Sequence, residues 1–134
     1  MVDQAQRKTA PLSLEQQRAA FAWQKVQGAN SEYTTLAKAA PALIMNNGLM
    51  QTLAFYQDKD KGHHRVLLGH LVDWLAQRFG GSELTNGEHY PASADFASSM
   101  NALLHADAAL YRRATDESLV LLRWIRQFAA AVSR

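Results

Sequence analysis

The stretch YRRATDESLVLLRWIRQFA, residues 111–129, decides the fold of this chain. Its apolar residues recur at steps of three and four positions, for example at Leu121, Trp124 and Phe128, and this is the period of an amphipathic α-helix. Asp107, whose carboxylate suits a helix N-terminus, precedes the stretch. We therefore predict one long helix from about residue 107, with arginines at intervals along its polar side.

Helical periods also dominate the rest of the chain, and no clear alternating strand pattern is present. The predicted helices cover residues 13–28, 31–47, a segment that begins at 49, residues 63–79 and 93–105. Pro41 should break or kink the second of these, because proline lacks an amide donor. Residues 82–92 are polar and rich in turn residues, so we expect an exposed loop there. The sequence thus predicts an all-α, compact single-domain bundle of about six helices.

The spacing of the large apolar residues also predicts which of them form the core. Our predicted core consists of Trp23, Leu53, Phe55, Leu71, Trp74, Leu75, Leu121, Leu122 and Ile125. Because the aromatic residues follow these core-facing positions, the sequence predicts no platform on which RNA bases could stack.

Composition limits the possible classes of protein. The 134 residues are 48% apolar, which is enough for one domain with a real core. Residues 1–12 are expected to be a mobile polar tail, and residues 13–134 the helical domain. The chain has no cysteine, which excludes disulfides and thiolate metal sites. No signal peptide or membrane span is evident, so we expect a cytoplasmic protein.

The distribution of charge along the chain is more informative about possible partners than the net charge of +2. Residues 1–61 have a balance of +2, residues 62–106 a balance of −2, and residues 107–134 a balance of +2. If the first and last helices lie together, their basic faces could form one surface for an anionic partner.

Candidate catalytic groups are few. His63, His64 and His70 lack an HExxH pattern and are expected to be structural. Asp116 and Glu117 are adjacent in a helix, so they point about 100° apart and do not converge on one ion. Phosphate-binding loops of the GxxxxGK type and GxSxG elbows are absent from the sequence. We therefore predict no catalytic residue, no bound metal and no cofactor.

Glu117 lies in line with the apolar residues of the last helix and therefore needs a partner, since an unpaired buried charge is costly. Arg113 is four residues earlier and can reach it. We predict a structural Arg113–Glu117 ion pair, with contact to another subunit as the alternative.

Two patterns resemble a known family. The first is Ala37-Lys38, Pro41, Ile44, Asn47-Gly48-Leu49, Leu53-Ala54-Phe55 and Lys59. The second is Tyr111-Arg112, Thr115, Glu117, Leu122, Trp124 and Phe128-Ala129. Their order and spacing, in a chain of this size, are similar to those of the small helical subunit of the type III-B CRISPR effector, the Cmr RNA-targeting complex.

The resemblance implies a non-catalytic subunit whose copies stack into an inner filament and help to hold the guide RNA–target RNA duplex. Its implied partners are both RNAs, the other Cmr subunits and neighbouring copies of itself, with no membrane. It also implies RNA-facing roles for the charged positions Lys38, Lys59, Arg112 and Arg126. Arg18 and Lys25 join this set because they are seven residues apart and share a helix face.

Two alternatives stay open. The low net charge also suits a helical protein–protein interaction module without RNA contact. A small histidine-dependent nuclease would require His63, His64 or His70 at a cleft.

Overall fold

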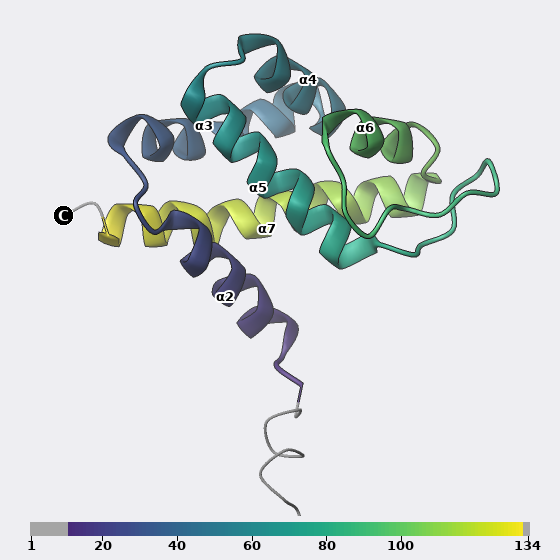
Figure 1. Ribbon diagram of the computed structural model, residues 1–134, viewed down its shortest axis with the longest axis horizontal. Helices are drawn as coiled ribbons and strands as arrows, with labels where there is room; N and C mark the ends of the chain where they lie inside the picture. Colours follow the sequence, from purple (N-terminus) through teal and green to yellow (C-terminus); the bar gives the residue numbers. More distant parts are fainter. Residues whose placement is uncertain (1–10, 133–134) are drawn as a thin grey trace, which may run out of the picture.

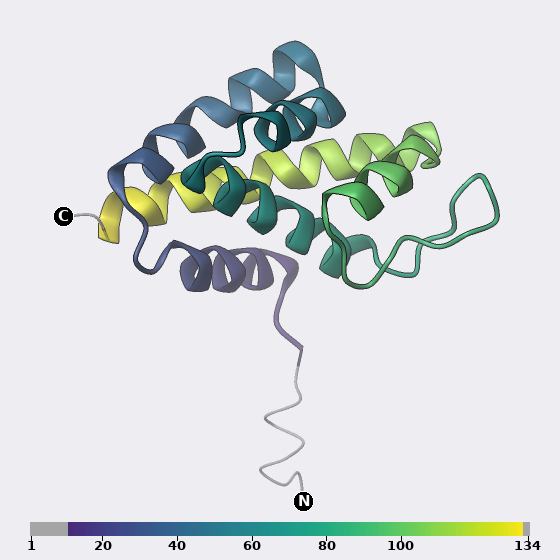
Figure 2. The same cartoon turned by 45° about the horizontal axis from the view of Figure 1, so that its top comes forward.

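The computed structural model describes residues 11–132, and within them the chain forms six α-helices and no strand (Figure 1). The helices are α2 (Leu14–Val26), α3 (Ser31–Asn47), α4 (Leu49–Lys59), α5 (Gly62–Phe79), α6 (Phe96–Leu104) and α7 (Ala108–Val132). Figures 1 and 2 show α7 along the long axis of the molecule, with α2 on one side of it and α3 and α4 on the other. The predicted all-α bundle is confirmed. The first ten residues of the expected tail lie outside the described part.

Local signals fix most helix ends. The Ser13 side chain accepts the Gln16 amide and the Gln16 side chain accepts the Ser13 amide, which is a complete capping box. Asp107 accepts the Leu110 amide at 2.8 Å, as its position predicts. The cap of α3 is Asn30, whose side chain accepts a hydrogen bond from the Tyr33 amide at 2.8 Å.

Pro41 does not break the second helix, because α3 continues through it to Asn47. A proline inside a helix costs about 3 kcal/mol. The burial of Ala37, Ala40 and Ile44 on the same helix offsets this cost, since these residues pack into the common core. Tertiary packing therefore outweighs the local preference.

The turn between α3 and α4 consists of one residue. Gly48 ends α3 and precedes α4 with φ of 89°, a conformation that favours glycine. The Tyr111 hydroxyl oxygen lies at this corner and accepts the Met50 amide at 3.2 Å. The start of α7 is thereby tied to the corner.

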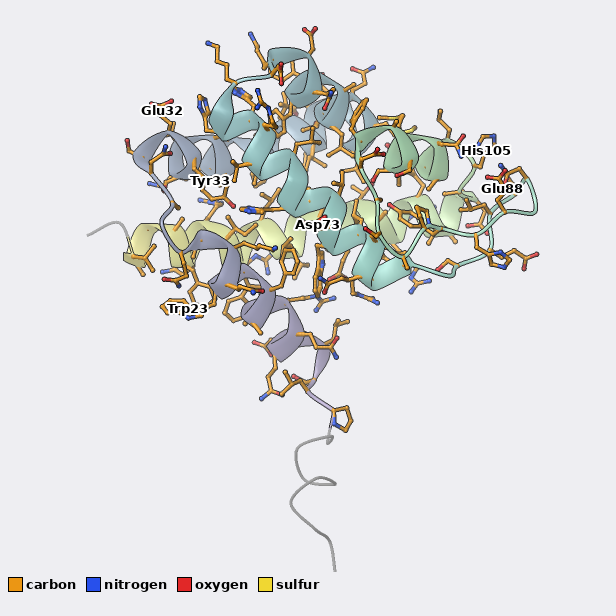
Figure 3. All side chains as sticks on the ribbon, in the orientation of Figure 1. Trp23, Glu32, Tyr33, Asp73, Glu88 and His105 are labelled. Carbon is orange, nitrogen blue, oxygen red and sulfur yellow. The ribbon has the colours of Figure 1, made fainter. Side chains whose placement is uncertain are left out.

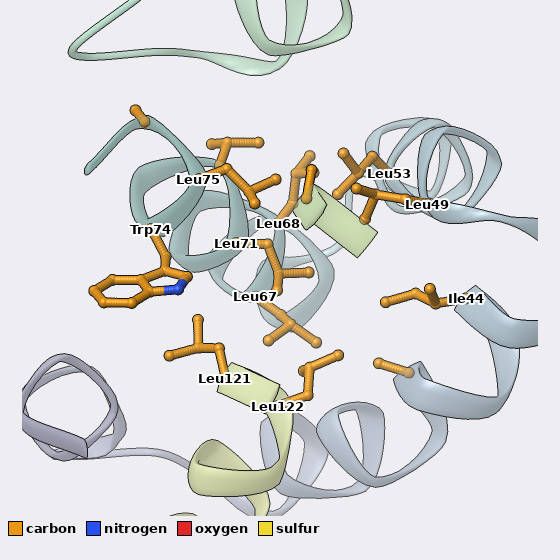
Figure 4. Packing of buried hydrophobic residues seen from close by; sticks show 14 of the residues in the cluster. Ile44, Leu49, Leu53, Leu67, Leu68, Leu71, Trp74, Leu75, Leu121 and Leu122 are labelled. Carbon is orange, nitrogen blue, oxygen red and sulfur yellow. The ribbon is translucent and has the colours of Figure 1, made fainter. Parts of the chain in front are cut away.

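The core lies where α5 and α7 meet α3 and α4 (Figure 4). Of the predicted core residues, Leu53, Leu71, Trp74, Leu75, Leu121, Leu122 and Ile125 are buried. The prediction is wrong for Trp23 and Phe55, because 50% and 43% of their surfaces are exposed. On α2 the buried positions are Phe21, Ala22 and Val26, and Trp23 lies outside this buried set. Among the described helices, none is both long and apolar enough to cross a lipid bilayer.

The segment after α5 is a mostly exposed loop, as the sequence predicts, and it makes several contacts that the sequence does not predict. Glu83 and His89 form an antiparallel bridge, and Leu84 and Tyr90 are buried. The Thr85 amide also donates to the His105 carbonyl at 2.7 Å, which ties the segment to the end of α6. Two buried apolar side chains and these backbone hydrogen bonds together hold the segment in place.

Candidate nucleic-acid interface

Three cations from two helices line one hollow on the surface. Lys38 of α3 and Arg123 and Arg126 of α7 surround a cavity of about 270 Å³, which Gln127 and Ala130 complete. The sequence predicts Lys38 and Arg126 as RNA-facing residues, and the structure places them at the same site. Arg123, on the polar side of the same helix, is not in the predicted set.

The packing of α3 and α7 explains this arrangement. Ala37 and Ala40 are buried, so Lys38 between them turns outward. On α7, Leu122 and Ile125 enter the core and leave Arg123 and Arg126 exposed. Within residues 11–132, no carboxylate comes within ion-pair distance of these three cations. Among the described residues the positive charge of the hollow is therefore not compensated, which suits an anion such as a phosphate.

The other predicted cations lie elsewhere. Arg112 is exposed on α7, about 16 Å along the helix axis from Arg123. The Lys59 ammonium lies 5.1 Å from the centre of the Phe55 ring, and that of Lys25 lies 5.2 Å from the centre of the Phe21 ring. Only Lys38 and Arg126 of the predicted set line the hollow.

Arg18 has a different environment from the one its helix face suggests. Its Nε and Nη2 donate to the two carboxylate oxygens of Glu117 at 2.6 and 2.8 Å. Trp74 Nε1 donates to the same carboxylate at 3.0 Å, and Arg78 Nε approaches it at 3.5 Å. Arg18 therefore joins α2 to α7 through an internal ion pair, and this geometry does not favour an RNA-facing role for it.

These contacts govern the ionisation of Glu117. The side chain is buried, and burial by itself would raise the pKa of the carboxyl group. Hydrogen bonds from Arg18 and Trp74, together with the charges of Arg18 and Arg78, outweigh burial and hold the pKa of Glu117 below its ordinary value. Glu117 is thus a carboxylate at neutral pH.

The prediction of an Arg113–Glu117 ion pair is wrong. Glu117 is buried and paired, as the sequence argument requires, but its partners come from α2 and α5. The Arg113 guanidinium instead lies 5.2 Å from the centre of the Phe79 ring. An arginine one turn away was the only partner visible in the local sequence, whereas the actual partner is 99 positions away.

The histidines do not form a single cluster. His63 Nδ1 lies 3.0 Å from Glu32, while His70 Nδ1 hydrogen-bonds with the Tyr33 hydroxyl at 2.8 Å. Burial, aided by the charge of Lys25, lowers the pKa of His70 to about 4. In the part of the chain that the structure describes, no three His, Asp or Glu side chains are arranged to hold a metal ion.

A cluster of aromatic side chains lies at the surface, where the sequence predicts no such platform. The Trp23 ring of α2 meets the Phe128 ring of α7 at 5.2 Å between centres, and Phe128 meets Trp124 at 5.4 Å. Figure 3 shows Trp23 on the outer side of α2, beside the C-terminal half of α7. The sequence places Trp124 and Phe128 on the apolar side of the last helix, and both are partly buried.

Known proteins are similar to this chain over most of its length. The profile of the family described as "CRISPR-associated protein (Cas_Cmr5)" matches residues 14–132, which include all six helices. A curated protein of Thermus thermophilus, "CRISPR system Cmr subunit Cmr5", is 28% identical over 116 residues, which cover 83% of this chain and 88% of that protein. The chain therefore belongs to the Cmr5 family of CRISPR-associated proteins, the small subunits of the type III-B Cmr system.

Proposed function

We propose that this chain is a non-catalytic small subunit of a Cmr ribonucleoprotein that holds the guide RNA–target RNA duplex through phosphate contacts. Family membership supports a place in a Cmr complex. The observation that carries the RNA contact is the hollow that brings Lys38, Arg123 and Arg126 together. The cytoplasm is its proposed place of action.

The chemistry of the hollow favours phosphates over bases. Guanidinium groups bind phosphate oxygens with two parallel hydrogen bonds, and a lysine ammonium adds a mobile charge. Such contacts carry no sequence information. A subunit that serves every guide RNA requires this kind of binding. Arg112, about three helical turns from Arg123, extends the positive surface along α7.

The dependence of RNA affinity on salt tests this proposal. We expect the variant Arg123→Gln/Arg126→Gln, assembled in the complex, to bind target RNA more weakly than the wild type. The slope of log affinity against log salt should fall by roughly 1.8 for a duplex, because each phosphate contact contributes about 0.9. The loss should be equal for two unrelated guide sequences.

Arg65→Gln is the matched control, since Arg65 is an exposed arginine of α5 that pairs with Asp60 at 3.0 Å. It should leave the slope unchanged. An unchanged slope in the double variant, or a defect confined to one guide, would refute the phosphate contacts.

The non-catalytic role has its own test. Purified protein, incubated with RNA and Mg²⁺, should leave the RNA intact. Cleavage that disappears in a His63→Ala/His64→Ala variant would establish the nuclease alternative instead.

Contacts with neighbouring copies form the architectural part of the proposal. Met45 and Phe55 are exposed near the α3–α4 corner, and Phe55 borders an open hollow of about 260 Å³ together with Leu43. Apolar groups of this kind favour association. Sedimentation at rising concentration should show self-association that Met45→Gln weakens, and a wild-type protein that stays monomeric would contradict this role.

A further inference from the structure

The aromatic cluster formed by Trp23, Trp124 and Phe128 has features that packing alone does not explain. Trp23 is in contact with Phe128 and yet leaves half of its surface open to solvent. Contiguous apolar groups at the surface are a feature of binding sites, and the three rings form such a group.

The cluster and the basic hollow flank the exposed side of α7, the cluster toward α2 and the hollow toward α3. Trp124 and Phe128 form one row on α7, four residues apart, and Arg123 and Gln127 form the adjacent row. Arg123 and Gln127 line the hollow, so its edge is one residue away from the aromatic row. Side chains of neighbouring rows diverge by about 100° from Cα atoms about 3.8 Å apart. A strand that crosses this side of the helix could therefore place a base on the cluster and neighbouring phosphates against Arg123.

We infer that the aromatic cluster stacks an unpaired RNA base while Arg123 and its neighbours bind the adjoining phosphates. This inference rests on the proposed phosphate contacts and adds a second kind of contact to them. Aromatic side chains beside a basic groove are the general means by which proteins hold single-stranded RNA, and stacking tolerates any base because every base has a π-face. The site would therefore accept all target sequences.

The ligand is single-stranded because a base within an A-form duplex is already stacked on both faces by its neighbours. Only a base that has left the duplex, or that lies beyond its end, can pack on Trp23. The uncompensated charge of Lys38, Arg123 and Arg126 favours RNA over an apolar protein surface as the occupant.

The test compares three ligands of equal length on the full-length protein at low salt: single-stranded RNA, blunt duplex RNA, and an abasic strand with the same phosphates. Single-stranded RNA should quench tryptophan fluorescence, and Trp23→Leu should bind it about 5- to 100-fold more weakly than the wild type does. Trp23→Phe should retain most of the affinity, because it keeps a ring. Leu104→Ala on α6 is the control for loss of an exposed apolar side chain, since Leu104 is 62% exposed.

The outcomes separate this inference from the proposed function. If the abasic strand binds as tightly as normal RNA, with undiminished salt dependence, the phosphate contacts stand and the stacking site is refuted. If none of the ligands binds, the proposed function fails as well. If Trp23→Leu leaves RNA affinity unchanged but disrupts self-association, the cluster is a protein interface and the inference is wrong.

Discussion

Arg18 and Glu117 are 99 positions apart in the chain, and the guanidinium of one donates to both oxygens of the other. Glu117 is 4% exposed, while the Arg18 side chain is 22% exposed. The pair therefore lies at the edge of the core, where it joins α2 to α7, and Trp74 and Arg78 bring α5 into the same contact.

Removing the charge of Glu117 should destabilise the protein. Glu117→Gln leaves Arg18 and Arg78 facing a neutral group, and the expected loss is about 2–4 kcal/mol in the free energy of unfolding, measured with urea. Asp116→Asn is the matched control on the same helix, because Asp116 is exposed, and it should change stability by less than about 0.5 kcal/mol. Equal effects of the two changes would show that the ion pair contributes little.

Acid should weaken the fold in two steps. The pKa of His70 is about 4 in the folded protein and near 6.5 in the unfolded chain. The unfolded chain therefore takes up a proton first, and stability falls as the pH drops from about 6.5 towards 4. Glu117, whose pKa is lowered on folding, adds its loss only below its ordinary value of 4.5, as the pH falls through the folded pKa.

His70→Gln tests the first step, because glutamine does not titrate. The free energy of unfolding of this variant should change less between pH 7 and pH 5 than that of the wild type. His89→Gln, at an exposed position, should retain the wild-type dependence. A His70→Gln protein with an unaltered pH profile would assign the acid sensitivity to other groups.

Core packing predicts large effects at Leu71 and Leu121, which are 1% and 0% exposed. Replacing either with Ala should cost about 2–5 kcal/mol, because a cavity remains in a close-packed interior. Thermal or urea unfolding measures the loss, and Leu104→Ala serves as the exposed control. Losses below about 0.5 kcal/mol at both core positions would contradict the packing described above.

Two glycines should respond to alanine in opposite directions. Gly48 has φ of 89° and ψ of 160°, a region almost restricted to glycine, so Gly48→Ala should destabilise by about 1–3 kcal/mol. Gly69 lies inside α5 with nothing within 4 Å of an added Cβ, so Gly69→Ala should stabilise by about 0.5–1 kcal/mol. Urea unfolding of the two variants side by side is the measurement, and the same sign for both would contradict the assigned backbone conformations.

Local sequence signals were sufficient to predict where the helices lie. They were insufficient to predict which side chains reach the surface. Ser13, Asp107 and Gly48 act through neighbours three to four residues away, so their effect could be predicted from the chain alone. Trp23 could not be placed in this way. Its helix has two possible apolar sides, and the choice between them depends on where α7 packs.

The candidate site illustrates the same division. Lys38 and Arg126 were predicted as separate charges, and only the packing of α3 on α7 makes them one hollow with Arg123. Arg18 was assigned to a solvent-facing surface because Glu117, its partner, lies at the other end of the sequence. Helix geometry predicts which residues share a face, but it does not predict what that face meets.

The position of α7 at the centre of the bundle has a consequence for synthesis. This helix packs against α2, α3 and α5, so the earlier helices have no complete core until it has left the ribosome. Contacts of such long sequence separation delay folding until nearly the whole chain is available. Chains truncated before residue 108 would expose the apolar sides of α2 and α3 together, and a cell would recognise them as substrates for chaperones and proteases.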